Sequence, residues 1–125
     1  MKKTISTTNA PAAIGPYSQG TIHNNTIYVS GQLPIDPATG ELIQGDIKAQ
    51  THMVMKNISA IIESGGGKLQ NALKITVLLT DLTNFAAVNE VYATYFPENP
   101  PARICYQVTA LPKGAEIEID AVCAL

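Results

Sequence analysis

The sequence predicts a single α+β domain in which two helices cover one face of a mixed sheet of five or six strands. Two observations carry this prediction. Two segments repeat apolar residues at helical spacing, and several shorter segments either alternate polar and apolar residues or are apolar throughout, as strands are. A length of 125 residues without internal repeats or linkers also fits one domain, spanning residues 1–125.

The first part of the chain is predicted to form short strands and loops. Strands are expected over residues 4–7, 18–23 and 26–31. Two prolines disfavour helix between the first two strands, so Tyr17 stands at the exit of an extended loop. Asn24 and Asn25 tolerate the positive φ of a tight hairpin turn. Residues 33–45 contain prolines and glycines and are predicted to be a loop.

The middle of the chain contains both predicted helices. Asp46 suits the N-cap of the first helix, whose apolar stripe runs on to three consecutive glycines that provide a left-handed terminator. Thr83 or Asn84 is expected to cap the second helix, which ends before Pro97. Between the helices, residues 73–81 are almost continuously apolar, which is typical of a strand covered on both faces.

The apolar run of residues 73–81 also bears on assembly. Two helices on one side of the sheet leave the other face of this strand uncovered. Because large apolar surfaces are rarely left in water, the second face needs cover from another subunit. The sequence therefore predicts a homo-oligomer, whose subunit interfaces are natural places for clefts.

The last quarter of the chain is predicted to be an antiparallel hairpin. Residues 102–108 and 117–123 alternate as strands and are joined by the turn-forming Leu-Pro-Lys-Gly. In a symmetric register Gln107 lies opposite Glu118, and opposed residues share a face of the sheet. We therefore expect Arg103 to share a face with the carboxylates.

Arg103 is the only arginine in the chain, since the other seven of the eight basic residues are lysines. Its planar guanidinium can hold a carboxylate through two parallel hydrogen bonds, which a lysine cannot do. Alternatively, Arg103 neutralises acidic neighbours across the hairpin, because buried arginines are usually paired. The pattern alone leaves both interpretations open.

Composition excludes several classes of function. The net charge of −2 and the single arginine give no basic surface for DNA or RNA, so a nucleic-acid partner is not expected. The chain starts with Met-Lys-Lys, but no apolar signal-peptide core follows, and no segment is long enough to span a membrane. His23 and His52 have no second ligand at metal spacing, and we predict no metal site.

The two cysteines bear on cellular location. Cys105 and Cys123 have no CxxC spacing, and the predicted hairpin points them to opposite faces of adjacent strands, where a disulfide is not expected. Two unpaired thiols in a chain without a secretion signal indicate a reducing, cytoplasmic setting.

Four segments resemble the reactive-intermediate (enamine/imine) deaminase family, also called the YjgF/YER057c/UK114 family. They are APAAIGPYSQG (10–20), VSGQ (29–32), FAAVNEVYATYF (85–96) and PARIC…LPKGAEIEIDA (101–121). The resemblance implies a chorismate-mutase-like fold and a homotrimer with active clefts between subunits. It also implies hydrolysis of imines and enamines such as 2-aminoacrylate, released by pyridoxal-phosphate enzymes, to 2-oxo acids and ammonia.

The resemblance also assigns residues. Arg103 matches the arginine that binds the substrate carboxylate, and Glu118 matches the glutamate associated with the catalytic water. The positions that match the lining of the family's cleft are Tyr17, Ser30, Asn89 and Cys105. Ile104 and Asp120 depart from the smaller residue and the glutamate that are frequent in the family, and these changes bear on substrate range.

The chemistry of imine hydrolysis needs little beyond these groups. An imine carbon is already electrophilic, so catalysis mainly requires a held carboxylate and an aimed water, and no cofactor is expected. No histidine is placed to activate Cys105, so the thiol is not expected to be a nucleophile. Two other functions remain open: a regulatory protein that binds small carboxylates without catalysis, and the ribonuclease activity attributed to some relatives.

Overall fold

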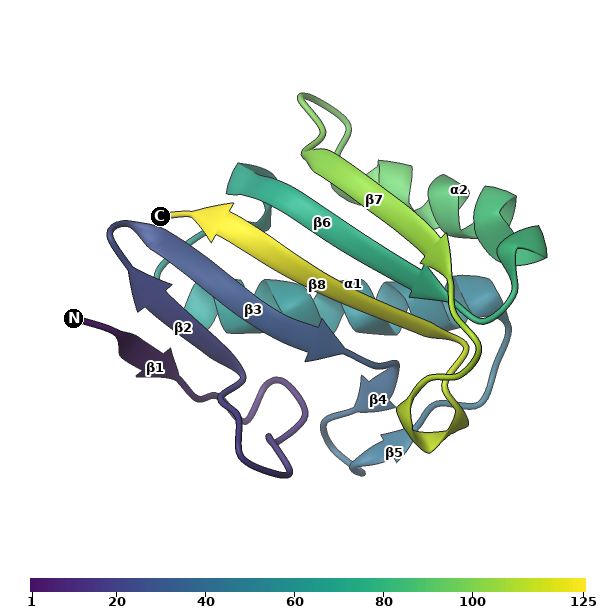
Figure 1. The fold of residues 1–125 in the computed structure, drawn as a ribbon, viewed down its shortest axis with the longest axis horizontal. Helices are drawn as coiled ribbons and strands as arrows, with labels where there is room; N and C mark the ends of the chain where they lie inside the picture. Colours follow the sequence, from purple (N-terminus) through teal and green to yellow (C-terminus); the bar gives the residue numbers. More distant parts are fainter.

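The computed structural model describes all of residues 1–125 and contains a six-stranded mixed sheet with two helices on one face (Figure 1). The helices are α1 (Ile47–Ser64) and α2 (Phe85–Tyr95). The strands of the sheet are β1 (Lys3–Ile5), β2 (Gly20–His23), β3 (Thr26–Gln32), β6 (Ala72–Leu79), β7 (Ala102–Gln107) and β8 (Ile117–Ala124). The predicted α+β class, the size of the sheet and the placement of both helices on one face are confirmed.

The order of the strands is β1-β2-β3-β8-β6-β7. β6 and β7 are parallel to each other, and β8 runs antiparallel between β3 and β6. The predicted pairing of the last two strands in a hairpin is therefore wrong. The segment between them is not a tight turn but a loop with a single 3-10 turn at Pro112–Gly114, long enough to step across β6. The apolar β6 thereby gains a hydrogen-bonded neighbour on both of its edges.

Strand register places Arg103 and Glu118 on opposite faces of the sheet. Arg103 lies in one row with Ile75 and Ala121, which are buried on the side of the helices. Glu118 lies opposite Leu78, whose side chain points the other way. The prediction that Arg103 shares a face with the carboxylates is wrong, because it depended on the hairpin register.

The cysteines need a similar correction. Cys105 lies opposite Val77 and Cys123 opposite Ala72, and both side chains point to the helix-covered face. They are therefore not on opposite faces of adjacent strands, since β6 separates β7 from β8. Both cysteines are free thiols, as expected.

Local signals in the sequence correctly mark several element boundaries. The carboxylate of Asp46 accepts a hydrogen bond from the backbone N–H of Ala49 at 2.9 Å and caps α1. Gly66 follows the helix with a φ of 90°, which only glycine adopts readily. Asn24 and Asn25 have φ values of 47° and 61° and join β2 to β3.

Two local predictions differ from the structure. The segment of residues 33–45 contains a small hairpin of β4 (Ile35–Asp36) and β5 (Glu41–Leu42), and is not wholly a loop. Asn84 makes no side-chain capping bond at α2. Instead, the carboxylate of Asp81 accepts from the backbone N–H of Thr83 at 2.9 Å and caps a 3-10 turn that leads into α2.

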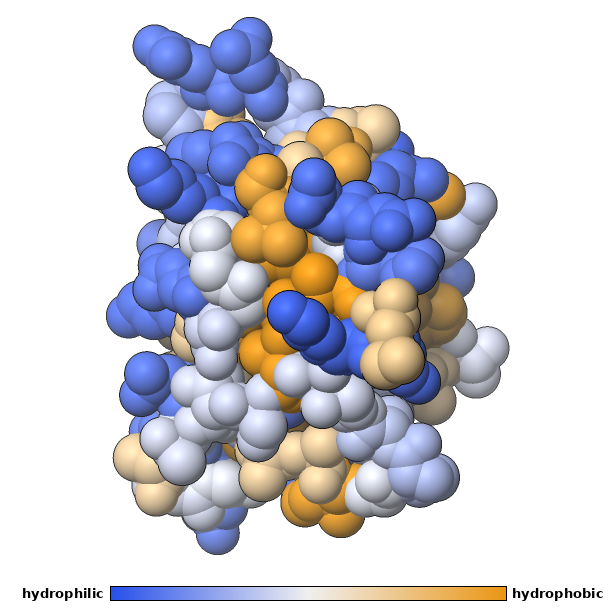
Figure 2. Space-filling view, turned by 90° about the vertical axis from the view of Figure 1, so that its left-hand side faces the viewer, coloured by the Kyte–Doolittle hydropathy of each residue, from blue (hydrophilic) through white to orange (hydrophobic).

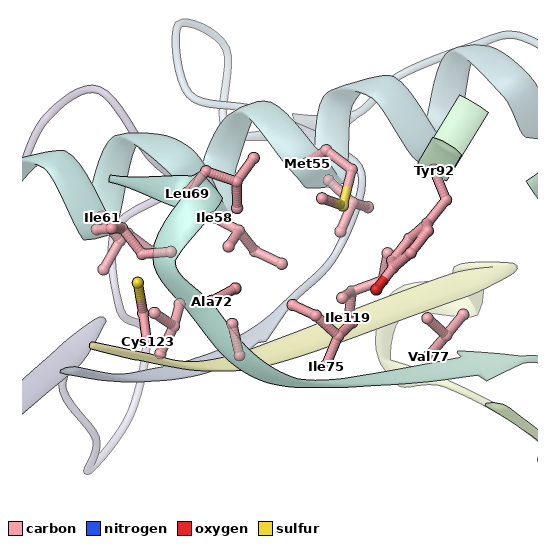
Figure 3. Packing of buried hydrophobic residues seen from close by; sticks show 14 of the residues in the cluster. Met55, Ile58, Ile61, Leu69, Ala72, Ile75, Val77, Tyr92, Ile119 and Cys123 are labelled. Atoms are coloured by element: carbon pink, nitrogen blue, oxygen red, sulfur yellow. The ribbon is translucent and has the colours of Figure 1, made fainter. Parts of the chain in front are cut away.

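The core lies between the helices and the sheet (Figure 3). Met55, Ile58 and Ile61 of α1 point toward the sheet, where Ile75 and Ile119 face them. Each of these large side chains stabilises the fold by about 1.5–3 kcal/mol when it is fully buried. The packed core fixes β6 and β8, and thereby the neighbouring β7 and β3.

The opposite face of the sheet has no helix over it (Figure 1). Tyr28 and Tyr106 lie on this open face, with 48% and 55% of each residue exposed. Figure 2 shows a different side, near the two termini, where a narrow apolar band is bordered by polar side chains. Neither helix combines the length and apolar character needed to cross a lipid bilayer.

Candidate functional site

Arg103 is held against one side of α2. Its Nη1 donates a hydrogen bond to Oδ1 of Asn89 at 2.7 Å. The guanidinium carbon lies 4.7 Å from the centroid of the Tyr92 ring and 5.4 Å from that of the Phe85 ring. Phe85, Asn89 and Tyr92 follow one another at helical spacing, so one side of α2 makes all three contacts. The guanidinium therefore has a defined position between β7 and α2.

The charge of Arg103 has no carboxylate partner within the chain. The one ion pair in the structure joins Lys48 and Glu90 on the surface, at 2.7 Å. A guanidinium has five N–H donors, and Arg103 uses one of them on Asn89. Within the chain, Arg103 therefore does not neutralise a nearby acid. Its remaining donors are available to an anionic ligand.

Cys105 lies two residues beyond Arg103 on the same face of β7 and packs against the edge of the core. Burial raises the pKa of its thiol, and the Arg103 charge opposes this only in part. The ring of His52 bonds to the hydroxyl of Tyr95 at 2.8 Å and does not serve the thiol. Cys105 therefore stays protonated and is not activated as a nucleophile.

Tyr17, Ser30 and Glu118 lie together elsewhere, around a cleft of about 660 Å³. The loop before β2, the end of β3 and the 3-10 turn after β7 form its walls. Tyr17 is 51% exposed at the rim. Lys113 also lines the cleft. A phenol, a hydroxyl, an ammonium and a carboxylate thus surround a space large enough for a small metabolite.

The hydroxyl of Ser30 has a defined hydrogen-bond direction. Its Oγ lies 2.5 Å from the carbonyl oxygen of Ser18. Because a carbonyl can only accept, Ser30 donates its one proton to Ser18. The lone pairs of its oxygen remain free to accept a hydrogen bond. Ser30 is therefore suited to an N–H group of a ligand and unsuited to a carboxylate.

Glu118 packs closely against Gly31. A β-carbon added to Gly31 would lie 3.0 Å from Cδ of Glu118, closer than ordinary van der Waals contact. The register between β3 and β8 shifts between Val29 and Gln32, which gives β3 an extra residue at this point. Burial raises the pKa of Glu118, and the charge of Asp120 raises it further. The carboxyl is thereby brought closer to the pKa that a general base and acid needs near neutral pH.

We expect Glu118→Gln to raise the resistance of the protein to urea at pH 7. The pKa of Glu118 is raised above its ordinary value of 4.5, so its ionised form costs stability once the pH exceeds that value. Glutamine keeps the shape of the side chain and removes this cost. The advantage over the wild type should shrink as the pH falls from 7 and vanish below 4.5, measured as urea midpoints across that range.

Glu116→Gln is the matched control for this experiment. Glu116 is exposed and stands just before β8, and its replacement changes the net charge equally. Its effect on the urea midpoint should be smaller, because the carboxylate of Glu116 is exposed to water. A midpoint for Glu118→Gln below that of the wild type at pH 7 would contradict the assigned sign.

Gln19 fixes the loop that carries Tyr17. Only 4% of Gln19 is exposed, and its Oε1 accepts from the backbone N–H of Thr7 at 2.7 Å. Its Nε2 faces the carbonyl oxygens of Thr7, Ala10 and Pro11 at 3.0, 3.3 and 2.8 Å. One side chain thus satisfies several backbone groups of a segment without regular structure. Tyr17 is positioned by this amide as well as by its own contacts.

The structure separates the six predicted site residues into two groups. The arginine group, on the helix-covered side next to α2, comprises Arg103, Asn89 and Cys105. The cleft group, around the cleft described above, comprises Tyr17, Ser30 and Glu118. The two groups do not meet within one chain, because Arg103 and Glu118 lie on opposite faces of the sheet.

Phe85 and Tyr92, which contact Arg103, and Gln19, which fixes the Tyr17 loop, were not predicted as site residues from the sequence. The helical spacing of Phe85, Asn89 and Tyr92 is visible in the sequence. Their contact with Arg103 is not, because it depends on which strand pairs with β7. The sequence does not indicate that Gly31 lies against Glu118. Nothing in the sequence marked Gln19 as the residue that fixes the loop.

Comparison with known proteins gives full-length matches. The family model described as endoribonuclease L-PSP matches residues 7–125. A RutC family protein of Pyrococcus horikoshii is 52% identical, over 98% of this chain and 97% of its own. The 2-iminobutanoate/2-iminopropanoate deaminase of Rattus norvegicus is 49% identical, over 98% of this chain and 89% of its own. The chain belongs to the endoribonuclease L-PSP family.

Solved structures in the endoribonuclease L-PSP family share the fold closely. RidA from an Antarctic Psychrobacter species superposes with a TM-score of 0.95 at 49% identity, covering 98% of this chain and 99% of its own. Escherichia coli TdcF with bound serine superposes with a TM-score of 0.93 at 40% identity, covering 98% of each chain. The resemblance to reactive-intermediate deaminases that the motifs indicated is confirmed.

Proposed function

We propose that this protein hydrolyses reactive imines and enamines of the 2-aminoacrylate type to 2-oxo acids and ammonia, with residues 1–125 forming one deaminase domain. The observation that carries the proposal is the guanidinium of Arg103, held by an amide and two rings with its other donors unpaired. Such a group binds a carboxylate through two hydrogen bonds. A relative at 49% identity is named for deamination of 2-imino acids, each of which carries a carboxylate.

The catalytic site is proposed to form between subunits of a homotrimer. The arginine group of one subunit faces the cleft group of the next, so each subunit contributes to two sites. This proposal is supported by the position of Arg103 and Glu118 on opposite faces of the sheet. A neighbouring subunit would also cover the open face of the sheet, where Tyr28 and Tyr106 are about half exposed.

Ile104 and Asp120 lie on the same face of the sheet. Both lie opposite Thr76, so they form one row across β6 on the open face. They are therefore turned away from the guanidinium of Arg103. We propose that these two departures from the family pattern alter the packing of the neighbouring subunit and the environment of Glu118.

Substrate binding follows from the groups available. Arg103 binds the substrate carboxylate, and Asn89 keeps the guanidinium turned toward it. The nitrogen of the imine then lies toward Ser30, whose lone pairs accept an N–H hydrogen bond. Cys105 lines the site as a neutral thiol, and Tyr17 closes its rim. The imine carbon is thereby held beside Glu118.

Hydrolysis proceeds by addition of water and loss of ammonia. An enamine first takes a proton from water at its methylene carbon and becomes an imine whose nitrogen is protonated. Water attacks the imine carbon as Glu118 takes a proton from it, which forms the C–O bond of an aminoalcohol. Glu118 returns that proton to nitrogen, the C–N bond breaks, and loss of the hydroxyl proton leaves the 2-oxo acid. Glu118 carries the proton transfers of water addition and ammonia release, water supplies and accepts the other protons, and no cofactor is required.

The test is an assay coupled to a source of imine. A pyridoxal-phosphate dehydratase generates 2-aminoacrylate from an amino acid, and release of the 2-oxo acid is followed with and without this protein. We expect release well above the spontaneous rate. Calorimetric binding of 2-oxo acids without any acceleration would instead identify a non-catalytic carboxylate-binding regulator.

Ribonuclease activity is the third outcome that the assay must separate. The family model carries that description, yet the chain has a net charge of −2 and a single arginine. A ribonuclease of this kind would show RNA binding that weakens steeply with salt. We expect no such binding.

A further inference from the structure

The guanidinium of Arg103 is partly buried yet has no counter-ion in the chain. Removing a charge from water without a partner costs free energy, so some other group must offset that cost. Asn89 supplies one hydrogen bond, at 2.7 Å. The Tyr92 ring supplies a second contact, because its centroid lies 4.7 Å from the guanidinium carbon and well within cation–π range.

Tyr92 is anchored more firmly than the other ring beside Arg103. Only 6% of Tyr92 is exposed, and its side chain belongs to the hydrophobic core. Phe85 lies at the first residue of α2 and is 37% exposed. The contact of Arg103 with Tyr92 therefore ties the guanidinium to a fixed part of the fold.

We propose that Tyr92 is a positioning residue whose ring takes the place of a counter-ion and holds Arg103 ready for a substrate carboxylate. The inference rests on the proposed function and extends it to a residue that does not touch the substrate. A carboxylate partner would occupy the donors that bind substrate, whereas an aromatic face stabilises the cation and leaves the edge of the guanidinium free.

The ring of Tyr92, and not its hydroxyl, has this role. The hydroxyl is buried without a hydrogen-bond partner, and it points toward the sheet near Ile119 (Figure 3). Burial raises the pKa of Tyr92, and the opposing effect of Arg103 is smaller. The phenol is therefore neutral at neutral pH and cannot act as a counter-anion.

Phe96 provides a matched control. Its ring lies 5.0 Å from that of Tyr92, tilted by 49°, and Phe96 is 5% exposed. Replacing either residue by leucine removes an aromatic ring from the same part of the core. Of the two, only Tyr92 contacts Arg103.

The experiment compares Tyr92→Leu, Tyr92→Phe and Phe96→Leu. The readouts are kcat and KM for imine hydrolysis, the Kd for 2-oxobutanoate by calorimetry, and Tm. Tyr92→Leu should raise KM and Kd about five- to tenfold with little change in kcat, because Arg103 must then be immobilised on binding. Tyr92→Phe should keep the KM of the wild type with no loss in Tm, since it removes an unpartnered hydroxyl.

Phe96→Leu should lower Tm about as much as Tyr92→Leu while leaving KM and Kd unchanged. An equal rise in KM for Phe96→Leu would assign the effect to a loosened core and overturn the proposal. So would a Tyr92→Phe variant as impaired as Tyr92→Leu, which would assign the effect to the hydroxyl. Tyr92→Met serves as the variant without a ring if Tyr92→Leu does not fold.

The two proposals can fail separately. If the wild type binds 2-oxobutanoate without hydrolysing imines, the proposed function is wrong, and the Kd values still decide the role of Tyr92. If the wild type hydrolyses imines and the ring-less variant matches its KM and Kd, the role of Tyr92 alone is wrong.

Discussion

Arg103→Ala is expected to lower kcat/KM for imine hydrolysis about a hundredfold or more. The variant loses both the charge and the two parallel hydrogen bonds that fix the carboxylate, so the imine carbon is no longer held beside Glu118. Arg103→Lys should recover little of the activity, because an ammonium cannot reproduce the planar fork and does not stack on Tyr92 in the same way. Initial rates of 2-oxo acid release, with the imine generated in situ, measure the effect.

Lys48→Ala is the control for loss of positive charge. It changes the net charge by the same amount as Arg103→Ala, but Lys48 lies on the surface in an ion pair with Glu90. Its kcat/KM should equal that of the wild type. Equal rates for Arg103→Ala and the wild type would remove Arg103 from the proposed site.

Mixed oligomers of two inactive variants are expected to regain activity. Arg103→Ala and Glu118→Gln should each be nearly inactive alone, because in the proposed homotrimer every site of either variant lacks one group. When the two variants are unfolded and refolded together, some sites take Arg103 from one subunit and Glu118 from the other. Random mixing at equal amounts should restore about a quarter of the wild-type sites.

The design separates a shared site from a site within one chain. If both residues served a site in their own subunit, refolding together would restore nothing, and the observed rate would equal the mean of the two variants. Mixing without unfolding is the control, since intact oligomers keep their original subunits until they exchange. Rates should therefore rise only after co-refolding or slow exchange.

Patterns within short segments predicted the elements of this fold well. Asp46 begins α1 as its capping chemistry indicates, and Asn24 and Asn25 make the tight turn between β2 and β3. These features depend on neighbouring residues along the chain, where backbone sterics and single hydrogen bonds decide the outcome. The two-helix, mixed-sheet class followed from the same local signals.

Strand pairing could not be predicted in the same way. The last two strands alternate well enough to pair with each other, but β6 competes for both of them and lies between them. That competition depends on burial of the whole sheet, which no local pattern reports. The hairpin register places Glu118 on the same face as Arg103, whereas the side-chain alternation within each strand agrees with the structure.

The structure brings the predicted site residues into two groups, but it contradicts the prediction that Arg103 and Glu118 share a face. The motifs selected Arg103, Asn89 and Cys105, which lie close together, and Tyr17, Ser30 and Glu118, which line one cleft. What the sequence could not reveal is that these form two groups on different faces. Gln19 and Tyr92 were missed because their roles depend on contacts between distant elements, and composition does not mark such contacts.

Because Arg103 and Glu118 lie on opposite faces, the concentration of the protein should control its activity. In the proposed assembly a folded but solitary subunit binds carboxylates weakly and hydrolyses nothing, so association itself becomes the step that switches the activity on. Specific activity would then fall when the protein is diluted below the dissociation constant of the oligomer. Agents that separate subunits would act as inhibitors without entering the cleft.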